Sequence, residues 1–167
     1  MKKGIILPVI CLLMIQLHAQ TAAEYFARGK EKYGKQNFNE AKLDFNKAIE
    51  LNPQYAEAYL ERANLKAELM DYKNAILDYN KAIELNPKLP DIYVKRGVSK
   101  ANLQDFSGAT EDYSKAIEID STYAPAYYNR GFIKHRLGDK TGACTDWTNA
   151  GKFGSYAAYE LIDFFYK

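Results

Sequence analysis

The residues that could do acid–base, nucleophilic or metal chemistry are few and isolated. Beyond the first twenty residues the chain has one histidine, His135, and one cysteine, Cys144. No histidine, cysteine and carboxylate group has the spacing of a zinc site, and no Gly-Lys-Ser/Thr loop is present to hold a phosphate. Cys144 has no base paired with it, and we interpret it as a small buried residue because free cysteine is commonly buried. The sequence therefore predicts no catalytic residue, no metal and no cofactor, and an enzyme is the least favoured class.

A ladder of charges is the other chemical pattern in the chain. An arginine recurs four times with a lysine four residues after it, one helical turn away and so on the same face. The pairs are Arg28 and Lys32, Arg62 and Lys66, Arg96 and Lys100, and Arg130 and Lys134. An aspartate recurs with the same period, as Asp44, Asp78, Asp112 and Asp146.

Two interpretations of this ladder are open. Equal periods of both signs favour ion pairs between packed helices, and the alternative is a cationic stripe that binds a polyanion. For Arg62 the acidic partner is Asp44 or Asp78, and we expect Asp44, across the repeat boundary. Surface pairs of this kind would add only about 0.2–1 kcal/mol each, so we expect them to set the registration of the helices more than stability.

The elements that position these charges follow a fixed period of 34 residues. Four alanines keep this spacing, Ala41, Ala75, Ala109 and Ala143, and so do four tyrosines, Tyr25, Tyr59, Tyr93 and Tyr127. The units start at Ala22, Ala56, Pro90 and Ala124. A period of this size is typical of stacked helical repeats, in which each unit buries its apolar face against its neighbours. Such an architecture favours a binding scaffold over a catalyst.

Each unit is predicted to contain two helices, because its apolar residues recur at spacings of three and four. The first helix, of about 13 residues, has a small residue at its eighth position: Gly29, Ala63, Gly97 and Gly131. The second helix has an aromatic residue at position 24 of the unit: Phe45, Tyr79, Tyr113 and Trp147. Two helices approach closely only where one side chain is nearly absent, so we expect the aromatic ring to fill that gap.

In these residues the chain resembles the tetratricopeptide repeat, a helix–turn–helix unit of 34 residues. The resemblance covers residues 22 to about 153. It implies an all-α solenoid, a right-handed arc of four helix–turn–helix repeats plus a C-terminal capping helix. We expect one tetratricopeptide repeat domain over 21–167, with repeats at about 22–55, 56–89, 90–123 and 124–155 and the capping helix at 156–167. Gly151 and Gly154 are expected to shorten the last second helix.

The resemblance also implies a concave face lined by positions 2, 5, 6, 9, 12 and 13 of the first helices. The predicted partner-binding residues on this face are Phe26, Lys30, Tyr33, Leu60, Asn64, Lys95, Val98, Tyr128, Asn129, Phe132 and His135. We expect aromatic anchors at both ends to grip an extended or helical ligand, and truncating Tyr128 or Phe132 to weaken binding without changing melting. The alternative is that part of the face is covered by the segment near the leader or by contacts between copies.

One family-specific function is not supported. A subset of the family grips the C-terminal carboxylate of chaperones with a clamp of Lys, Asn and Arg, and the matching positions here do not have this set of residues in either register.

The first twenty residues are predicted to be a secretory signal peptide. Lys2 and Lys3 precede an uncharged apolar run over 4–17, and a small residue, Ala19, follows it. The run is shorter than the roughly 20 residues that span a bilayer, so a retained membrane anchor, with membrane contact, is only the alternative. We expect export to the periplasm or secretion.

Removing this leader leaves 21 basic and 21 acidic residues, because residues 1–20 contain two lysines and no acid. A neutral chain gives no support for nucleic-acid binding. With one cysteine left, no intramolecular disulfide is possible. We predict a non-catalytic scaffold whose partner is a protein or peptide. The alternative is a structural module that forms a homodimer through the C-terminal helix, where Leu161, Ile162 and Phe165 recur at helical spacing.

Overall fold

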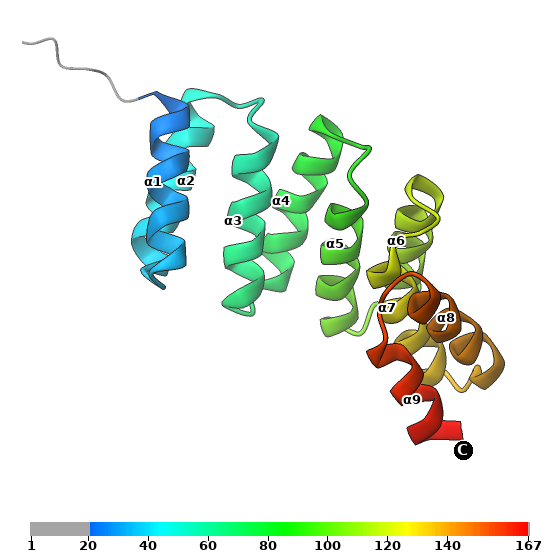
Figure 1. The fold of residues 1–167 in the computed structure, drawn as a ribbon. Helices are drawn as coiled ribbons and strands as arrows, with labels where there is room; N and C mark the ends of the chain where they lie inside the picture. Colours follow the sequence, from blue (N-terminus) through cyan, green and yellow to red (C-terminus); the bar gives the residue numbers. More distant parts are fainter. Residues whose placement is uncertain (1–20, 167) are drawn as a thin grey trace, which may run out of the picture.

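The computed structural model describes residues 21–166, which form a row of α-helices stacked in chain order (Figure 1). Consecutive helices pair as hairpins, and each hairpin packs against the next. The predicted all-α solenoid of four hairpins and a terminal helix is confirmed. The helices are α1 (Ala22–Gly34), α2 (Phe38–Leu51), α3 (Ala56–Glu68), α4 (Tyr72–Leu85), α5 (Pro90–Asn102), α6 (Phe106–Ile119), α7 (Ala124–Arg136), α8 (Lys140–Lys152) and α9 (Ala157–Tyr166).

The turn inside each hairpin requires a residue in the left-handed region of backbone space. Repeats one to three place a non-glycine residue there, Gln36, Met70 and Gln104, with φ of 61° to 65°. Repeat four places Gly138 at the same position, with φ of 86°. A residue with a Cβ atom adopts this conformation at a cost of about 1–2 kcal/mol, and glycine does not. In the first three repeats the packing of the two helices must therefore offset the cost of the left-handed conformation. In the fourth repeat the glycine adopts this conformation without that cost.

The core of each repeat is the predicted contact between a small residue and an aromatic ring. A Cβ atom added to Gly131 would lie 2.5 Å from Nε1 of Trp147. Equivalent atoms on Gly29 and Gly97 would lie 2.7 Å from the Phe45 ring and 2.6 Å from the Tyr113 ring. Such separations are too short for real atoms, so in these three repeats the helices approach as closely as they do only because no side chain is present, and the second repeat has the small Ala63 packed in one cluster with Tyr79.

The charge ladder forms ion pairs within each repeat. Arg62 donates from Nε and Nη2 to the two carboxylate oxygens of Asp78, at 2.8 and 2.7 Å, and Lys66 Nζ lies 2.6 Å from the same carboxylate. The other three repeats have the same arrangement. These aspartates are buried, so the pairs are not the surface pairs that the sequence suggested. The ion-pair interpretation is confirmed, because every arginine and lysine of the ladder is paired with an aspartate, and each aspartate is shared by two cations.

The expectation that Arg62 pairs with Asp44 was wrong. The aspartate of the ladder lies on the second helix of each repeat and faces the first helix of the same repeat, so Arg62 pairs with Asp78 rather than Asp44. The contact across the repeat boundary is made by a neutral side chain, since Nη1 of Arg62 donates to Oδ1 of Asn46 at 2.7 Å.

Helix α9 closes the C-terminal end of the stack by packing on α8. The ring of Phe165 stacks on that of Trp147 with centroids 5.9 Å apart, and Trp147 is fully buried. Helix α8 has 13 residues where the other second helices have 14, in line with the expected shortening.

The predicted signal peptide lies outside the described residues. Within 21–166 no helix is both long and apolar enough to cross a membrane.

Candidate partner-binding groove

A cavity of about 440 Å³ lies where three successive first helices face the same side of the stack. Four of its lining residues, Tyr33 of α1, Asn64 of α3, and Lys95 and Val98 of α5, belong to the predicted concave face. We call this cavity the groove. Its complete lining is Tyr33, Asn64, Ala67, Tyr72, Tyr79, Lys95, Val98, Ser99 and Asn102.

Helix α5 contributes four side chains from two successive turns to the groove. Lys95, Val98, Ser99 and Asn102 are spaced at three, four and seven residues, which places them on one face of a helix. The equivalent of Ser99 is Leu65 in α3 and Ile133 in α7, and both of these fill the core. The smaller serine leaves open the space that an aliphatic side chain occupies in the neighbouring repeats. This difference accounts for a cavity at the third repeat.

The polar side chains of the groove are fixed by hydrogen bonds to each other and to acids beside them. Tyr79 Oη donates to Oδ1 of Asn64 at 3.0 Å, and Asn64 Nδ2 donates to Oε2 of Glu61 at 3.1 Å. Tyr33 Oη donates to Oε2 of Glu68 at 2.6 Å. Among the described residues no buried side-chain polar atom lacks a partner. The groove is therefore preorganised, which lowers the entropy lost when a ligand binds.

Two phenols of the groove stay protonated at neutral pH. Burial raises the pKa of Tyr33, and its hydrogen bond to Glu68 raises it further. Burial also raises the pKa of Tyr79, with the negative charge of Asp91 adding to the effect. Both hydroxyl groups therefore remain hydrogen-bond donors.

The predicted residues of the fourth repeat lie elsewhere, against α8 and α9. Phe132 packs edge-on to Trp147 with ring centroids 5.4 Å apart, and Tyr128 packs on Phe132 at 5.1 Å. His135 Nδ1 lies 2.6 Å from Tyr166 Oη. These side chains are half-buried in the terminal core. This packing argues against the expectation that truncating Tyr128 or Phe132 leaves melting unchanged, because removing a half-buried ring also removes core contacts.

The remaining predicted residues also lie outside the groove lining. Phe26 packs on Tyr55, with ring centroids 4.9 Å apart, and Leu60 packs in the core of the second repeat. Lys30 is exposed, with Nζ 5.6 Å from the Phe26 ring centroid. Asn129 Nδ2 donates to the Pro125 carbonyl at 2.7 Å. The structure thus brings Tyr33, Asn64, Lys95 and Val98 together in the groove. Phe26 packs in the core of the first repeat, and the aromatic residues of the fourth repeat pack in the terminal core.

Five lining residues were not predicted as site residues or were assigned another role. Tyr79 was interpreted only as a core aromatic, although a buried phenol needs a hydrogen-bond partner and so indicates a polar neighbour. Ser99 breaks the apolar pattern at its position, which was the available signal. Asn102 is at an inward position that was not selected. Ala67 is also at an inward position that was not selected, and Tyr72 gave no separate signal.

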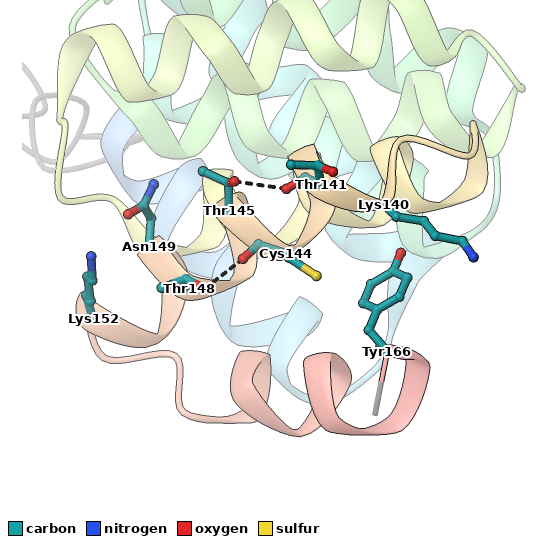
Figure 2. A pocket seen from close by; sticks show the side chains of 8 residues that line it. All are labelled: Lys140, Thr141, Cys144, Thr145, Thr148, Asn149, Lys152 and Tyr166. Carbon is teal, nitrogen blue, oxygen red and sulfur yellow. Dashed lines mark hydrogen bonds between the residues drawn. The ribbon is translucent and has the colours of Figure 1, made fainter.

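A second hollow, of about 560 Å³, lies along α8 and reaches Tyr166 of α9. Figure 2 shows Cys144 on the side of α8 that faces Tyr166. Cys144 is half-buried, which corrects its interpretation as a buried residue. A hydroxyl group beside it forms a hydrogen bond within the helix, since Thr148 Oγ1 donates to the Cys144 carbonyl at 2.7 Å. Within 21–166 no three potential metal ligands cluster, so this hollow offers a thiol without a metal site.

Comparison with known proteins identifies the architecture. A family model described as TPR repeat matches residues 67–104 and 100–138, and one described as tetratricopeptide repeat matches residues 25–55. Among curated protein sequences none matches.

Solved structures share the fold. One is MamA, with a TM-score of 0.71 and 20% identity over 81% of this chain and 84% of that chain. Another is MamA from residue 41 to its end, from Desulfovibrio magneticus RS-1, with a TM-score of 0.76 and 17% identity over 81% of this chain and 77% of that chain. A third is the first TPR of Spaghetti (RPAP3) bound to the HSP90 peptide SRMEEVD, with a TM-score of 0.68 and 24% identity over 71% of this chain and 94% of that chain.

Proposed function

Since the chain belongs to the tetratricopeptide repeat family, we propose that it is a non-catalytic protein-interaction scaffold that binds a peptide or a partner helix in the groove. The observation behind this proposal is the convergence of Tyr33, Asn64 and Val98 from three successive repeats on one cavity. A volume of about 440 Å³ is within the range of ligand sites.

A peptide is the ligand class that the comparisons support. The Spaghetti domain was solved with a bound peptide, and it shares this fold. Here, however, the complete set of residues of the carboxylate clamp is present in neither register. We therefore propose a peptide or helix held by mixed apolar and polar contacts in the groove, rather than by its terminal carboxylate.

The test fills the groove with a side chain that the fold already accepts. Ser99→Ile reproduces at α5 the residue that α7 has at this position, where Ile133 packs in one cluster with Tyr113. We expect this variant to fold and melt like the wild type but to lose partners captured by cross-linking in the native compartment. Leu77→Asp is the control, because Leu77 is 63% exposed and lies outside the groove lining. Partners that Ser99→Ile retains in full would contradict binding in the groove.

The second candidate function is self-association through α9. Phe164 is 80% exposed and Tyr156 is 76% exposed, unusual values for aromatic side chains at the end of a stack. Light scattering of the wild type and of Phe164→Glu distinguishes the two functions. A dimer that Phe164→Glu converts to a monomer favours the structural module, and a wild-type monomer excludes it.

We also propose that the protein is exported and that residues 1–20 are removed. The charged start, the apolar run and the small residue Ala19 support this proposal. The intact mass of the protein from its native host should then correspond to a chain that begins near Gln20 or Thr21. A full-length mass in the membrane fraction would indicate a retained anchor instead.

A further inference from the structure

We propose that the groove selects a basic peptide segment, in which an apolar side chain enters the cavity and a neighbouring lysine or arginine meets the carboxylates on its rim. This inference rests on the proposed function of the groove and adds the chemistry of its ligand.

Carboxylates hold three of the polar side chains that line the groove. Tyr33 is bonded to Glu68, Asn64 is bonded to Glu61, and Lys95 is paired with Asp91, whose Oδ2 lies 3.0 Å from Lys95 Nζ. We call Glu61, Glu68, Asp91 and Lys95 the rim of the groove, and these four side chains have three negative charges and one positive charge. The single ammonium group is already paired, so the excess charge that a ligand meets is negative.

Glu61 and Glu68 are the two acids available to a ligand. Within residues 21–166 each accepts a hydrogen bond from a neutral donor of the groove lining and neither forms an ion pair with a lysine or arginine. The aspartates of the charge ladder differ, because each of those is shared by an arginine and a lysine. Lys30, a cation of the first repeat on the predicted concave face, lies over the Phe26 ring instead.

The lining between these acids is suited to an apolar side chain. Val98, Ala67 and the Tyr33 and Tyr79 rings supply carbon surface, and Ser99, only 1% exposed, makes the space by being small. Acids in a concave surface with low-dielectric walls attract cations more strongly than acids on an open surface do. A basic residue beside an apolar one satisfies both parts of the site, whereas an acidic peptide would face the uncompensated carboxylates.

The experiment selects from a displayed library of short random peptides with the purified chain. We expect enriched sequences to place lysine or arginine next to a large apolar residue. Binding of a selected peptide should weaken about tenfold in the double variant Glu61→Gln with Glu68→Gln, which keeps an acceptor for Asn64 and Tyr33. It should also weaken as salt is raised. The control is Glu111→Gln, because Glu111 is exposed on α6.

The outcomes separate the two proposals. Enriched neutral or acidic peptides that bind the wild type but not Ser99→Ile would overturn the basic ligand and leave the groove as the site. No enrichment, or peptides that bind Ser99→Ile as well as the wild type, would overturn the groove itself. Glu61→Lys with Glu68→Lys should shift the selection toward acidic peptides, and an unchanged selection would contradict the charge argument.

Discussion

The contact between Gly131 and Trp147 shows how much depends on one missing methyl group. We expect Gly131→Ala to lower the free energy of unfolding by about 1–3 kcal/mol, because its Cβ atom would overlap the indole ring. Gly34→Ala is the matched control: a Cβ atom there meets nothing within 4 Å. It should raise stability by about 0.4–1 kcal/mol, because alanine restricts the unfolded chain. Urea unfolding measures both, and equal effects would contradict the packing argument.

The buried aspartates are the second feature at this scale. We expect Asp78→Ala to cost about 3 kcal/mol, because Arg62 and Lys66 would lose a shared buried carboxylate. The charge exchange Arg62→Asp with Asp78→Arg should recover part of the loss, and only part, since Lys66 would then face an arginine. The same exchange between Arg62 and Asp44 should recover nothing. A double-mutant cycle in urea gives the coupling energy, and coupling to Asp44 instead would contradict the observed pairing.

At the scale of the element, α9 acts as the cap of the last repeat. Phe165 stacks on Trp147 and lies 4.1 Å from the His135 ring, whereas its neighbour Phe164 points into solvent. We expect Phe165→Ala to cost about 1–2 kcal/mol, since its ring is only partly buried, and Phe164→Ala to change stability by less than about 0.5 kcal/mol.

Deleting 156–167 should lower the melting temperature further. Trp147 is the only tryptophan, so a red shift of its fluorescence reports its exposure. An unshifted spectrum after the deletion would mean that α9 is not the cap.

The sequence predicted the helices well because the same pattern of residues recurs in each repeat. The start of each first helix and the role of Gly131 both follow from a period of 34 residues. The prediction was weaker where the position of a side chain depends on contacts with a segment that is not part of the repeats. Tyr128 and Phe132 were assigned to the open face, because α9 breaks the repeat and nothing in the pattern shows that its aromatic residues reach back over α7. The groove at Ser99 was missed because it arises from a single difference between repeats.

At the scale of the whole molecule, each hairpin depends chiefly on its neighbours, so the two ends are the weakest parts of the stack. The C-terminal end has α9 as its cap. The first repeat has only the next repeat beside it within the described residues, and its ladder arginine, Arg28, has a side chain that is 38% exposed, against 17% for Arg62. We therefore expect α1 and α2 to open before the middle repeats do, and the groove to lose Tyr33 when they open.

Acid should bring out this difference between the ends and the middle. The hydrogen bond from Arg28, aided by Lys32, holds the pKa of Asp44 below its ordinary value, although burial of the carboxylate acts in the opposite direction. The folded chain thus takes up this proton at lower pH than the unfolded chain does. The stabilisation by Asp44 is complete above the unfolded pKa of about 4, and it is lost as the pH falls through the lower folded pKa.

We expect amide exchange in α1 and α2 to accelerate as the pH falls through that range, after correction for the intrinsic exchange rate. Asp44→Asn should already exchange faster at neutral pH and should change less with acid. Parallel pH profiles for the two proteins would show that another group controls the opening of the first repeat.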